Sequence, residues 1–281
     1  MTALLALVAS ALWGGADYLG GVLSRRLPVL SVTLVGQAAA LGAAAVVVTA
    51  LGAYAGWGAY LGWGLACGVV GPVALVAFYT ALATGTMGVV APIAATGVAL
   101  PVLVGLLRGE RPRALQLVGI VAAVVGVVLA ARAPRDGSAH GGRRPVLLAL
   151  LSAAGFGAVL LFVAEGSATS VGTTLVVQRV TNVTLLGVVL LVHLRRTGTR
   201  LGLARADLPV VTLTGLTDVS ANALYGIASR SGLVSVVAVL GSLYPVATAL
   251  LARRLLGERL AAGQAAGVAT ALVGVGLLAA G

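Results

Sequence analysis

The amino-acid sequence predicts an all-α integral membrane protein with ten transmembrane helices, arranged as two inverted five-helix repeats. Apolar residues make up 60% of the 281 residues and charged residues only 9%, whereas an ordinary soluble domain carries roughly 25% charged residues. The apolar residues form long runs with short polar breaks, which is the pattern of membrane-spanning helices. Short motifs of the first half of the chain also recur in the second half.

Each crossing of a bilayer core about 30 Å thick requires about 20 helical residues. Ten apolar runs of about this length predict spans at residues 2–23, 29–51, 58–83, 86–107, 114–131, 145–164, 171–194, 208–229, 232–255 and 261–280. No positively charged segment precedes the first run, so we interpret it as a membrane helix and not as a removable signal peptide. The break between the third and fourth runs, near Gly85, is the least distinct.

The chain is expected to divide into a first repeat over residues 1–131, a polar linker over 132–144 and a second repeat over 145–281. Because each repeat has an odd number of crossings, the second repeat enters the membrane from the opposite side. Inverted repeats of this kind are typical of secondary transporters, whose substrate site lies between the repeats near the bilayer midplane.

Several residue matches relate the two halves. Gly109-Glu110-Arg111 recurs as Gly257-Glu258-Arg259, Gln116 matches Gln264 at the same offset, Val89-Val90-Ala91 matches Val236-Val237-Ala238, and Trp13-Gly14 matches Phe156-Gly157. The glutamate and glutamine matches carry the most weight, because both residue types are scarce in this chain. The matches therefore favour two copies of one unit.

The net charge of +11 arises from 18 basic residues, all of them arginine, that gather mainly in the breaks between apolar runs. Loops that anchor to lipid head groups have this distribution, so no nucleic-acid partner is expected. The single cysteine, Cys67, and the separated histidines His140 and His193 predict neither a disulfide nor a metal site. There is no phosphate-binding loop and no soluble segment long enough for a catalytic domain, so we expect neither a cofactor nor an enzyme.

Two ionisable side chains fall deep within predicted spans, where a charge costs about 2.5–3.5 kcal/mol on insertion scales. Asp218 lies near the centre of the eighth span, with Asn222 one turn later, and its carboxyl group suits either a proton carrier or a structural partner. Arg179 lies about two turns into the seventh span. It is expected either to bind an anionic substrate group through bidentate hydrogen bonds or to pair with Asp218 or Glu165.

A third ionisable residue, Asp17, lies towards the end of the first span, and Gln37 begins the second span on the same side. Contact between Asp17 and Gln37 is therefore expected. Trp13 precedes Asp17 by one helical turn and shares its face, so it either lines a cavity or packs between helices. Tyr225 and Tyr244 are further candidates for cavity walls, with packing as the alternative.

Proline occurs inside the fourth and ninth predicted spans, at Pro92, Pro101 and Pro245. Proline removes a backbone donor and kinks a helix, and the freed carbonyl groups must face protein or water at membrane depth. We therefore predict that these prolines are helix hinges beside a cavity.

Glu110 and Glu258 each end a predicted span and are each followed by an arginine. We interpret them as members of interfacial ion pairs or as helix-end anchors. Their duplication does not change this interpretation, because a repeated unit repeats its scaffold too.

Several motifs follow one another in a defined order: Trp13-Gly-Gly-Ala-Asp17, Phe78-Tyr79-Thr-Ala-Leu82, Leu107-Arg-Gly-Glu110-Arg111, Ala223-Leu-Tyr225 through Gly232, and Leu256-Gly-Glu258-Arg259. In order, spacing and duplication they resemble the motifs of EamA-type transporters, members of the drug/metabolite transporter superfamily with ten helices in two repeats. The resemblance covers essentially the whole chain. It implies a proton-coupled or facilitated carrier of metabolites, often an exporter.

One departure from the family pattern concerns the second helix of each repeat, where members commonly carry an arginine. The second repeat has Arg179, but the matching position of the first repeat is Gln37. A mechanism that requires both arginines is therefore in doubt.

Orientation in the membrane has two conflicting indications. Thirteen arginines lie in the loops after the first, fifth, seventh and ninth predicted spans, and four lie in the loops after the fourth and eighth. The positive-inside rule then places both termini outside the cell, whereas the family resemblance implies termini inside.

These features together predict a multi-pass protein of the cell membrane that moves a small metabolite or drug-like molecule by alternating access, with proton-coupled export as one form. Its expected partners are the small-molecule substrate, the lipid bilayer and protons. The alternative is a membrane scaffold or lipid-handling protein without transport activity. The sequence does not specify the substrate, the direction of transport, the coupling ion or the oligomeric state.

Overall fold

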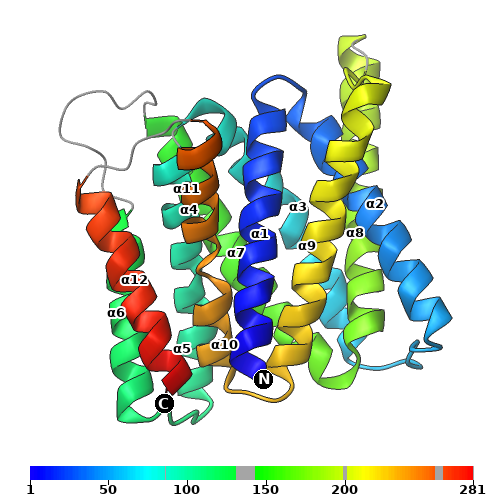
Figure 1. The fold of residues 1–281 in the computed structure, drawn as a ribbon. Coiled ribbons are helices and arrows are strands. Elements are labelled where there is room, and N and C mark those ends of the chain that lie inside the picture. Colours follow the sequence, from blue (N-terminus) through cyan, green and yellow to red (C-terminus); the bar gives the residue numbers. More distant parts are fainter. Residues whose placement is uncertain (86, 131–142, 199–200, 257–261, 281) are drawn as a thin grey trace.

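The computed structural model describes residues 1–85, 87–130, 143–198, 201–256 and 262–280, and no strand occurs within these residues. Figure 1 shows the arrangement of the helices. They are α1 (Thr2–Ser24), α2 (Val29–Ala50), α3 (Tyr60–Thr84), α4 (Met87–Ala95), η1 (Thr96–Val98), α5 (Ala99–Leu107), α6 (Ala114–Ala130), α7 (Arg143–Thr169), α8 (Val171–Thr197), η2 (Arg205–Asp207), α9 (Leu208–Ser229), α10 (Val234–Gly241), α11 (Tyr244–Leu255) and α12 (Ala262–Ala280). The expected helical fold class is confirmed.

Seven helical segments are long and apolar enough to cross a membrane: Thr2–Ser24, Val29–Ala50, Tyr60–Thr84, Val90–Leu107, Arg143–Thr169, Val171–Thr197 and Val234–Leu255. The protein is therefore a multi-pass membrane protein. Helices α6, α9 and α12 are not among the seven; the polar residues of α9 lower its hydropathy. Each predicted span overlaps a helix or a pair of helices, but the number of ten crossings stays a prediction.

The predicted linker, residues 132–144, lies mostly outside the described residues. Its last two residues, Arg143 and Arg144, form the start of α7, so this helix begins earlier than the predicted span. The Gly257-Glu258-Arg259 motif also lies outside the described residues.

The fourth and ninth predicted spans are both interrupted. A turn of 3₁₀-helix, η1, separates α4 from α5, and α10 ends one residue before Ser242, where the chain turns into α11. Pro92 lies inside α4, Pro101 lies in the first turn of α5, and Pro245 is the second residue of α11. A proline therefore accompanies each interruption, as expected from its missing backbone donor, while hinge motion stays a prediction.

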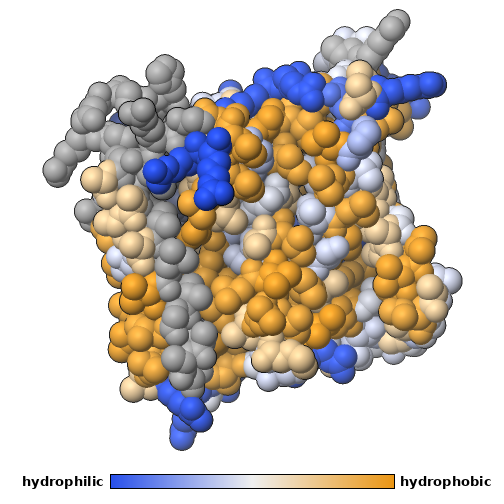
Figure 2. Space-filling model, in the orientation of Figure 1, coloured by the Kyte–Doolittle hydropathy of each residue, from blue (hydrophilic) through white to orange (hydrophobic). Residues whose placement is uncertain are grey.

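The helices run roughly side by side in one bundle (Figure 1). Helix α1 begins at one end, here called the lower end, and finishes at the opposite, upper end; α12 also finishes at the lower end. Helix α7, the counterpart of α1, runs in the opposite direction to α1. Figure 2 shows apolar side chains across the middle of one face and strongly hydrophilic side chains gathered at its two ends, the distribution that a bilayer requires.

Equivalent helix contacts relate the two halves of the chain. A Cβ atom on Gly14 of α1 would meet the Tyr244 carbonyl oxygen of α11. Gly157 of α7, the sequence match of Gly14, packs in the same way against the Gly97 carbonyl oxygen of η1. Small residues permit such close approach of membrane helices. The chain therefore repeats its packing as well as its motifs.

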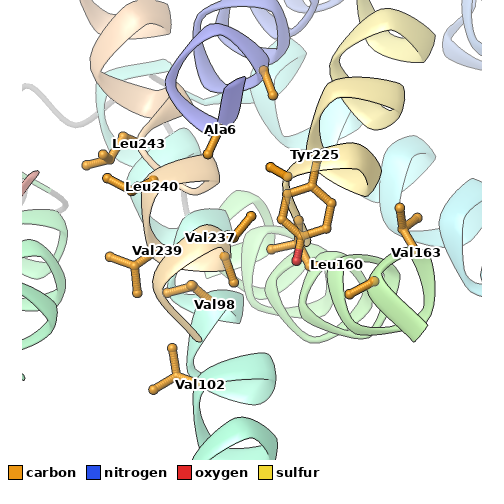
Figure 3. Packing of buried hydrophobic residues seen from close by; sticks show 14 of the residues in the cluster. Ala6, Val98, Val102, Leu160, Val163, Tyr225, Val237, Val239, Leu240 and Leu243 are labelled. Carbon is orange, nitrogen blue, oxygen red and sulfur yellow. The ribbon is translucent and has the colours of Figure 1, made fainter. Parts of the chain in front are cut away.

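Two apolar clusters fill the interior of the bundle. The lower cluster includes Ala6 and Tyr225. Figure 3 shows its side chains, with Leu160 and Val237 near the Tyr225 ring. The upper cluster includes Leu23 and Phe78. Trp13 packs against both clusters, so the clusters meet at the depth of this residue.

Candidate functional site

A cavity of about 80 Å³ lies inside the bundle at the level of Trp13. Its walls come from α1, α2, α3, α7, α8, α9 and the junction between α10 and α11. Seven of the predicted site residues line it: Trp13, Asp17, Gln37, Arg179, Asp218, Asn222 and Tyr244. Tyr225 is fully buried in the lower cluster, where its ring packs against Trp13 at a centroid distance of 5.6 Å, and it is not a wall residue.

An ion pair between the buried Arg179 and the partly exposed Asp218, whose side chain is 20% exposed, joins α8 and α9 at the cavity wall. Arg179 Nη1 donates to Asp218 Oδ2 at 2.8 Å, and the Arg179 side chain is only 2% exposed. Glu165, the alternative partner considered for Arg179, instead pairs with Arg108 at the lower end. The Arg179 guanidinium is thus held by a carboxylate of the neighbouring helix.

The Asp218 carboxylate accepts three further hydrogen bonds. Trp13 Nε1 and Asn222 Nδ2 donate to Oδ1 at 3.2 and 3.1 Å, and Gln37 Nε2 donates to Oδ2 at 3.3 Å. Asn222 lies one turn after Asp218 on α9 and therefore shares its face. Side chains of α1, α2, α8 and α9 thus meet at the Asp218 carboxylate.

Gln37 joins the two repeats through its side-chain amide. Its Oε1 atom accepts a hydrogen bond from Arg179 Nη1 and lies 2.8 Å from the Asn182 side-chain amide. The arginine position of the second repeat is therefore bonded to the glutamine that occupies the equivalent position of the first. No hydrogen bond joins Gln37 and Asp17 in the described part of the chain, although both residues line the cavity.

Some buried polar atoms of the wall have no hydrogen-bond partner within the described part of the chain. They are Arg179 Nε and Nη2, Gln178 Oε1, Asn222 Oδ1 and Tyr244 Oη. A buried polar group without a partner costs about 1–3 kcal/mol. These atoms have almost no accessible surface, so a ligand or water molecule would bond to them only after neighbouring side chains move; acceptor oxygens suit the two unpartnered nitrogens of Arg179.

The charges of the wall do not balance. Asp17 and Asp218 supply two carboxyl groups, and Arg179 is the one basic residue among the described lining residues. Asp17 is only 7% exposed. With both carboxyl groups ionised the cavity has an excess negative charge, which is costly in a low-dielectric interior. A proton or a cationic ligand group would compensate for it.

The sequence model of the EamA-like transporter family matches residues 1–132 and 143–280. The chain belongs to the EamA-like transporter family. The two matched segments are two copies of the EamA unit, which places the protein in the drug/metabolite transporter superfamily. The cavity of this EamA-like transporter lies between these segments, because Trp13, Asp17 and Gln37 come from the first and Arg179 and Asp218 from the second.

A solved structure described only as the crystal structure of a protein has the same overall fold. Its TM-score is 0.74 at 18% sequence identity, and the match covers 98% of this chain and 95% of that chain. At 18% identity, this similarity shows only that the two chains share a fold. No match is found among curated proteins.

Nine residues that line the cavity of the EamA-like transporter were not among the predicted site residues, and four of the nine are repeat counterparts of predicted ones. These four are Phe156 for Trp13, Leu160 for Asp17, Gly71 for Asp218 and Leu75 for Asn222. The sequence contained a signal for these four residues, because the residue spacing between the two repeats leads from each predicted residue to its counterpart. Their contacts match too: Phe156 packs against Phe78 at 5.3 Å, as Trp13 packs against Tyr225.

Glu110 holds the start of a helix in the other repeat. Its carboxylate accepts hydrogen bonds from the backbone N–H groups of Val234 and Ser235 at 2.9 and 3.1 Å, in the first turn of α10. A carboxylate there satisfies unpaired donors and complements the helix dipole. Of the two interpretations of Glu110, the structure therefore shows a helix-end anchor, and the anchored helix ends at the cavity residue Gly241.

Proposed function

We propose that this EamA-like transporter is a secondary carrier that moves a small metabolite or drug-like molecule across the cell membrane by alternating access. The cavity between the two repeats supports this proposal most directly, because it contains the Arg179–Asp218 ion pair and unpartnered polar atoms. Soluble substrates cross a membrane only through such a polar site. In this proposal the chain crosses the membrane ten times, as two oppositely oriented bundles.

Arg179 is the proposed contact for an anionic group of the substrate. Its Nε and Nη2 atoms are buried without a partner in the described residues, while Nη1 is bonded to Asp218 and Gln37. A carboxylate or similar group can accept two parallel hydrogen bonds from one edge of a guanidinium. Substrate binding would then satisfy donors that otherwise destabilise the cavity.

Asp17 and Asp218 are the proposed sites of proton coupling. Two carboxyl groups face one guanidinium, so one proton brings the wall to neutrality. An anionic substrate group that binds Arg179 weakens the hold of Arg179 on Asp218, and the released carboxylate can take up a proton. Proton and substrate binding are thereby linked through one ion pair.

The broken helices are the proposed moving parts. The α4–η1–α5 and α10–α11 interruptions lie in equivalent positions of the two repeats. Residues Gly241 and Ser242 at the second interruption line the cavity. Rotation at these points would change which end of the bundle closes over the cavity. Charges at membrane depth are costly to insert, so this charge network counts against a membrane scaffold without transport activity.

The proposal is tested with Asp218→Asn and Asp17→Asn in reconstituted vesicles. A screen of metabolites and toxic cations for thermal stabilisation of the purified protein first supplies a ligand for flux measurements. Asp218→Asn is expected to abolish flux or its pH dependence. Asp17→Asn leaves the Arg179–Asp218 pair in place, and it is expected to reduce the pH dependence of flux.

Asp207→Asn is the matched control, because Asp207 pairs with Arg26 at the upper end and lies outside the cavity. It should leave flux and its pH dependence unchanged. Each variant is checked by gel filtration before reconstitution. Unchanged, pH-dependent flux in both cavity variants would remove these carboxyl groups from the mechanism.

A further inference from the structure

A second hollow, of about 720 Å³, lies between α2, the start of α8 and α9. At Gly36 and Gly215 the helices α2 and α9 are in close contact, since a Cβ atom on Gly215 would clash with the Gly36 backbone. Towards the lower end α2 leans away from α9 (Figure 1). The hollow is therefore a groove that opens towards the lower end, here called the α2–α9 groove.

The walls of the α2–α9 groove are mainly aliphatic, with Val47, Leu175, Leu224 and Ile227 among them. Val47 and Ile227 are about half exposed, at 54% and 46%, so the groove is open to the surroundings of the bundle. In a membrane protein those surroundings at this depth are lipid chains. An unfilled apolar groove loses dispersion contacts, and it offers water too few polar partners.

The length of the α2–α9 groove matches one leaflet. Along α9 it extends from Val219 to Arg230, which at 1.5 Å per residue is about 16 Å. The hydrocarbon core of a bilayer is about 30 Å thick. A groove that starts at the lower helix ends therefore reaches about the bilayer midplane, which is the depth of one acyl chain.

A thin apolar wall separates the α2–α9 groove from the substrate cavity. Ala40, Ala44 and Val219 form a small buried cluster of their own. Ala44 and Val219 line the groove, whereas Asp218, the residue before Val219, lines the cavity. The two spaces therefore lie on opposite faces of α9 and are separate sites.

A positive charge stands at the mouth of the α2–α9 groove. Arg230 follows the end of α9, is exposed and is the one charged residue among the described lining residues. No ion pair of its side chain is found within the described part of the chain. An arginine at the ends of membrane helices lies at head-group depth, where it attracts anionic lipids.

We propose that the α2–α9 groove binds one acyl chain of an anionic phospholipid from the leaflet at the lower end, with the lipid phosphate paired to Arg230. The aliphatic walls of the groove, which are about as long as one leaflet is thick, hold the acyl chain. The Arg230 guanidinium selects an anionic head group. This lipid site goes beyond the proposed transport function and does not depend on it. The bound acyl chain also packs against Val219, on the side of this residue that faces away from the substrate cavity.

Native mass spectrometry of the purified protein tests the proposal, with phosphatidylglycerol and phosphatidylcholine of identical chains as probes. The wild-type protein should retain one phosphatidylglycerol at least about tenfold more tightly than phosphatidylcholine, a difference of about 1.4 kcal/mol. Arg230→Gln should abolish this preference but still bind a lipid. Ala223→Trp, which fills the groove, should weaken binding of both lipids by at least about tenfold.

Matched controls separate the groove from the general lipid surface. Leu213→Trp adds the same side chain to an exposed position of α9 outside the groove, and Arg111→Gln removes another lower-end arginine; both should bind as the wild type does. Ala43→Phe fills the groove from α2 if Ala223→Trp does not fold. Wild-type binding by a folded groove-filling variant would overturn the chain site, and an unchanged lipid preference in Arg230→Gln would overturn the phosphate contact.

Discussion

Asp218 and Arg179 differ in the partners that each keeps when the other charge is removed. Without Arg179, the Asp218 carboxylate still accepts hydrogen bonds from Trp13, Gln37 and Asn222. Without the Asp218 charge, Arg179 keeps the Gln37 oxygen as its one acceptor among the described residues. Two of its nitrogens already have no partner there. A buried charge without compensation is strongly destabilising.

We therefore predict an asymmetric effect on stability. Asp218→Asn should lower the free energy of unfolding by roughly 3–5 kcal/mol, as for other broken buried pairs, and Arg179→Gln should lower it less. The double variant should be more stable than Asp218→Asn alone, because it removes the guanidinium that has lost its bonded carboxylate, and the remaining Asp17 carboxyl can be neutralised by a proton. Unfolding in mixed detergent micelles measures all three values. Additive losses in the double variant would contradict the predicted coupling.

Sequence reasoning identifies charged site residues more readily than uncharged ones. Asp218 and Arg179 stand out because ionisable residues are rare in apolar runs. Phe156 and Leu75 do not stand out, because in a chain with 60% apolar residues an apolar wall residue resembles any other packing residue. The pairing of Arg179 with Asp218 and not Glu165 depends on helix rotation and depth, which sequence periodicity does not specify.

Among the helices, α10 depends most clearly on a distant part of the chain. Its N-terminal backbone donors are satisfied by Glu110 of the first repeat, although the sequence placed Glu110 beside Arg111. The position of Glu110 in its motif predicted that this residue anchors a helix end. It did not indicate that the anchored helix is α10. The contact joins the two repeats at the lower end, next to the interrupted ninth span.

Glu110→Ala is predicted to destabilise the protein by about 1–2 kcal/mol, the cost of losing a helix cap. Arg111→Ala should cost less than about 0.5 kcal/mol, as expected for a surface position. Thermal unfolding of the two variants distinguishes the helix cap from a pair between neighbours. Equal losses would favour the Glu110–Arg111 pair over the cap.

Helix boundaries and helix tilt also differ in how well the sequence predicts them. The prolines indicated where the fourth and ninth spans are interrupted, because a missing donor acts locally. The start of α7 at Arg143 was missed, because its first turn is charged and the membrane pattern starts later. The α2–α9 groove was not predictable, since it arises from the tilt of α2 below Gly36.

At the scale of the whole molecule, charge is distributed unevenly between the two ends. Described arginines of the upper end occur after α1, at the start of α7, at the end of α8, in η2 and at the end of α11. The lower end has Arg108, Arg111, Arg113 and Arg230. The fold thus keeps the two arginine groups of the sequence at opposite ends. The duplication of the repeat unit was predictable. The odd number of crossings in each copy and the orientation that results from it stay predictions.

We predict from this asymmetry that the upper end faces the cytoplasm and that α1 begins outside the cell. A C-terminal alkaline phosphatase fusion should be active, and a C-terminal green fluorescent protein fusion should be dark in a bacterial host. Fusions after Arg196 should give the reverse pattern and serve as the control. A fluorescent C-terminal fusion would instead support the orientation that family resemblance implies.

The ion pair belongs wholly to the second repeat, and its counterpart position Gly71 in the first repeat carries no side chain although it borders the cavity. A Cβ atom there would meet no neighbouring atom closer than 3.6 Å, so alanine fits at this position without a clash. The two repeats thus contribute unlike walls to the cavity: the second repeat supplies the charged side chain of Asp218, and the first has only a glycine at the equivalent position. If the cavity binds substrate as proposed, a single codon change at Gly71 is a route by which its lining can change.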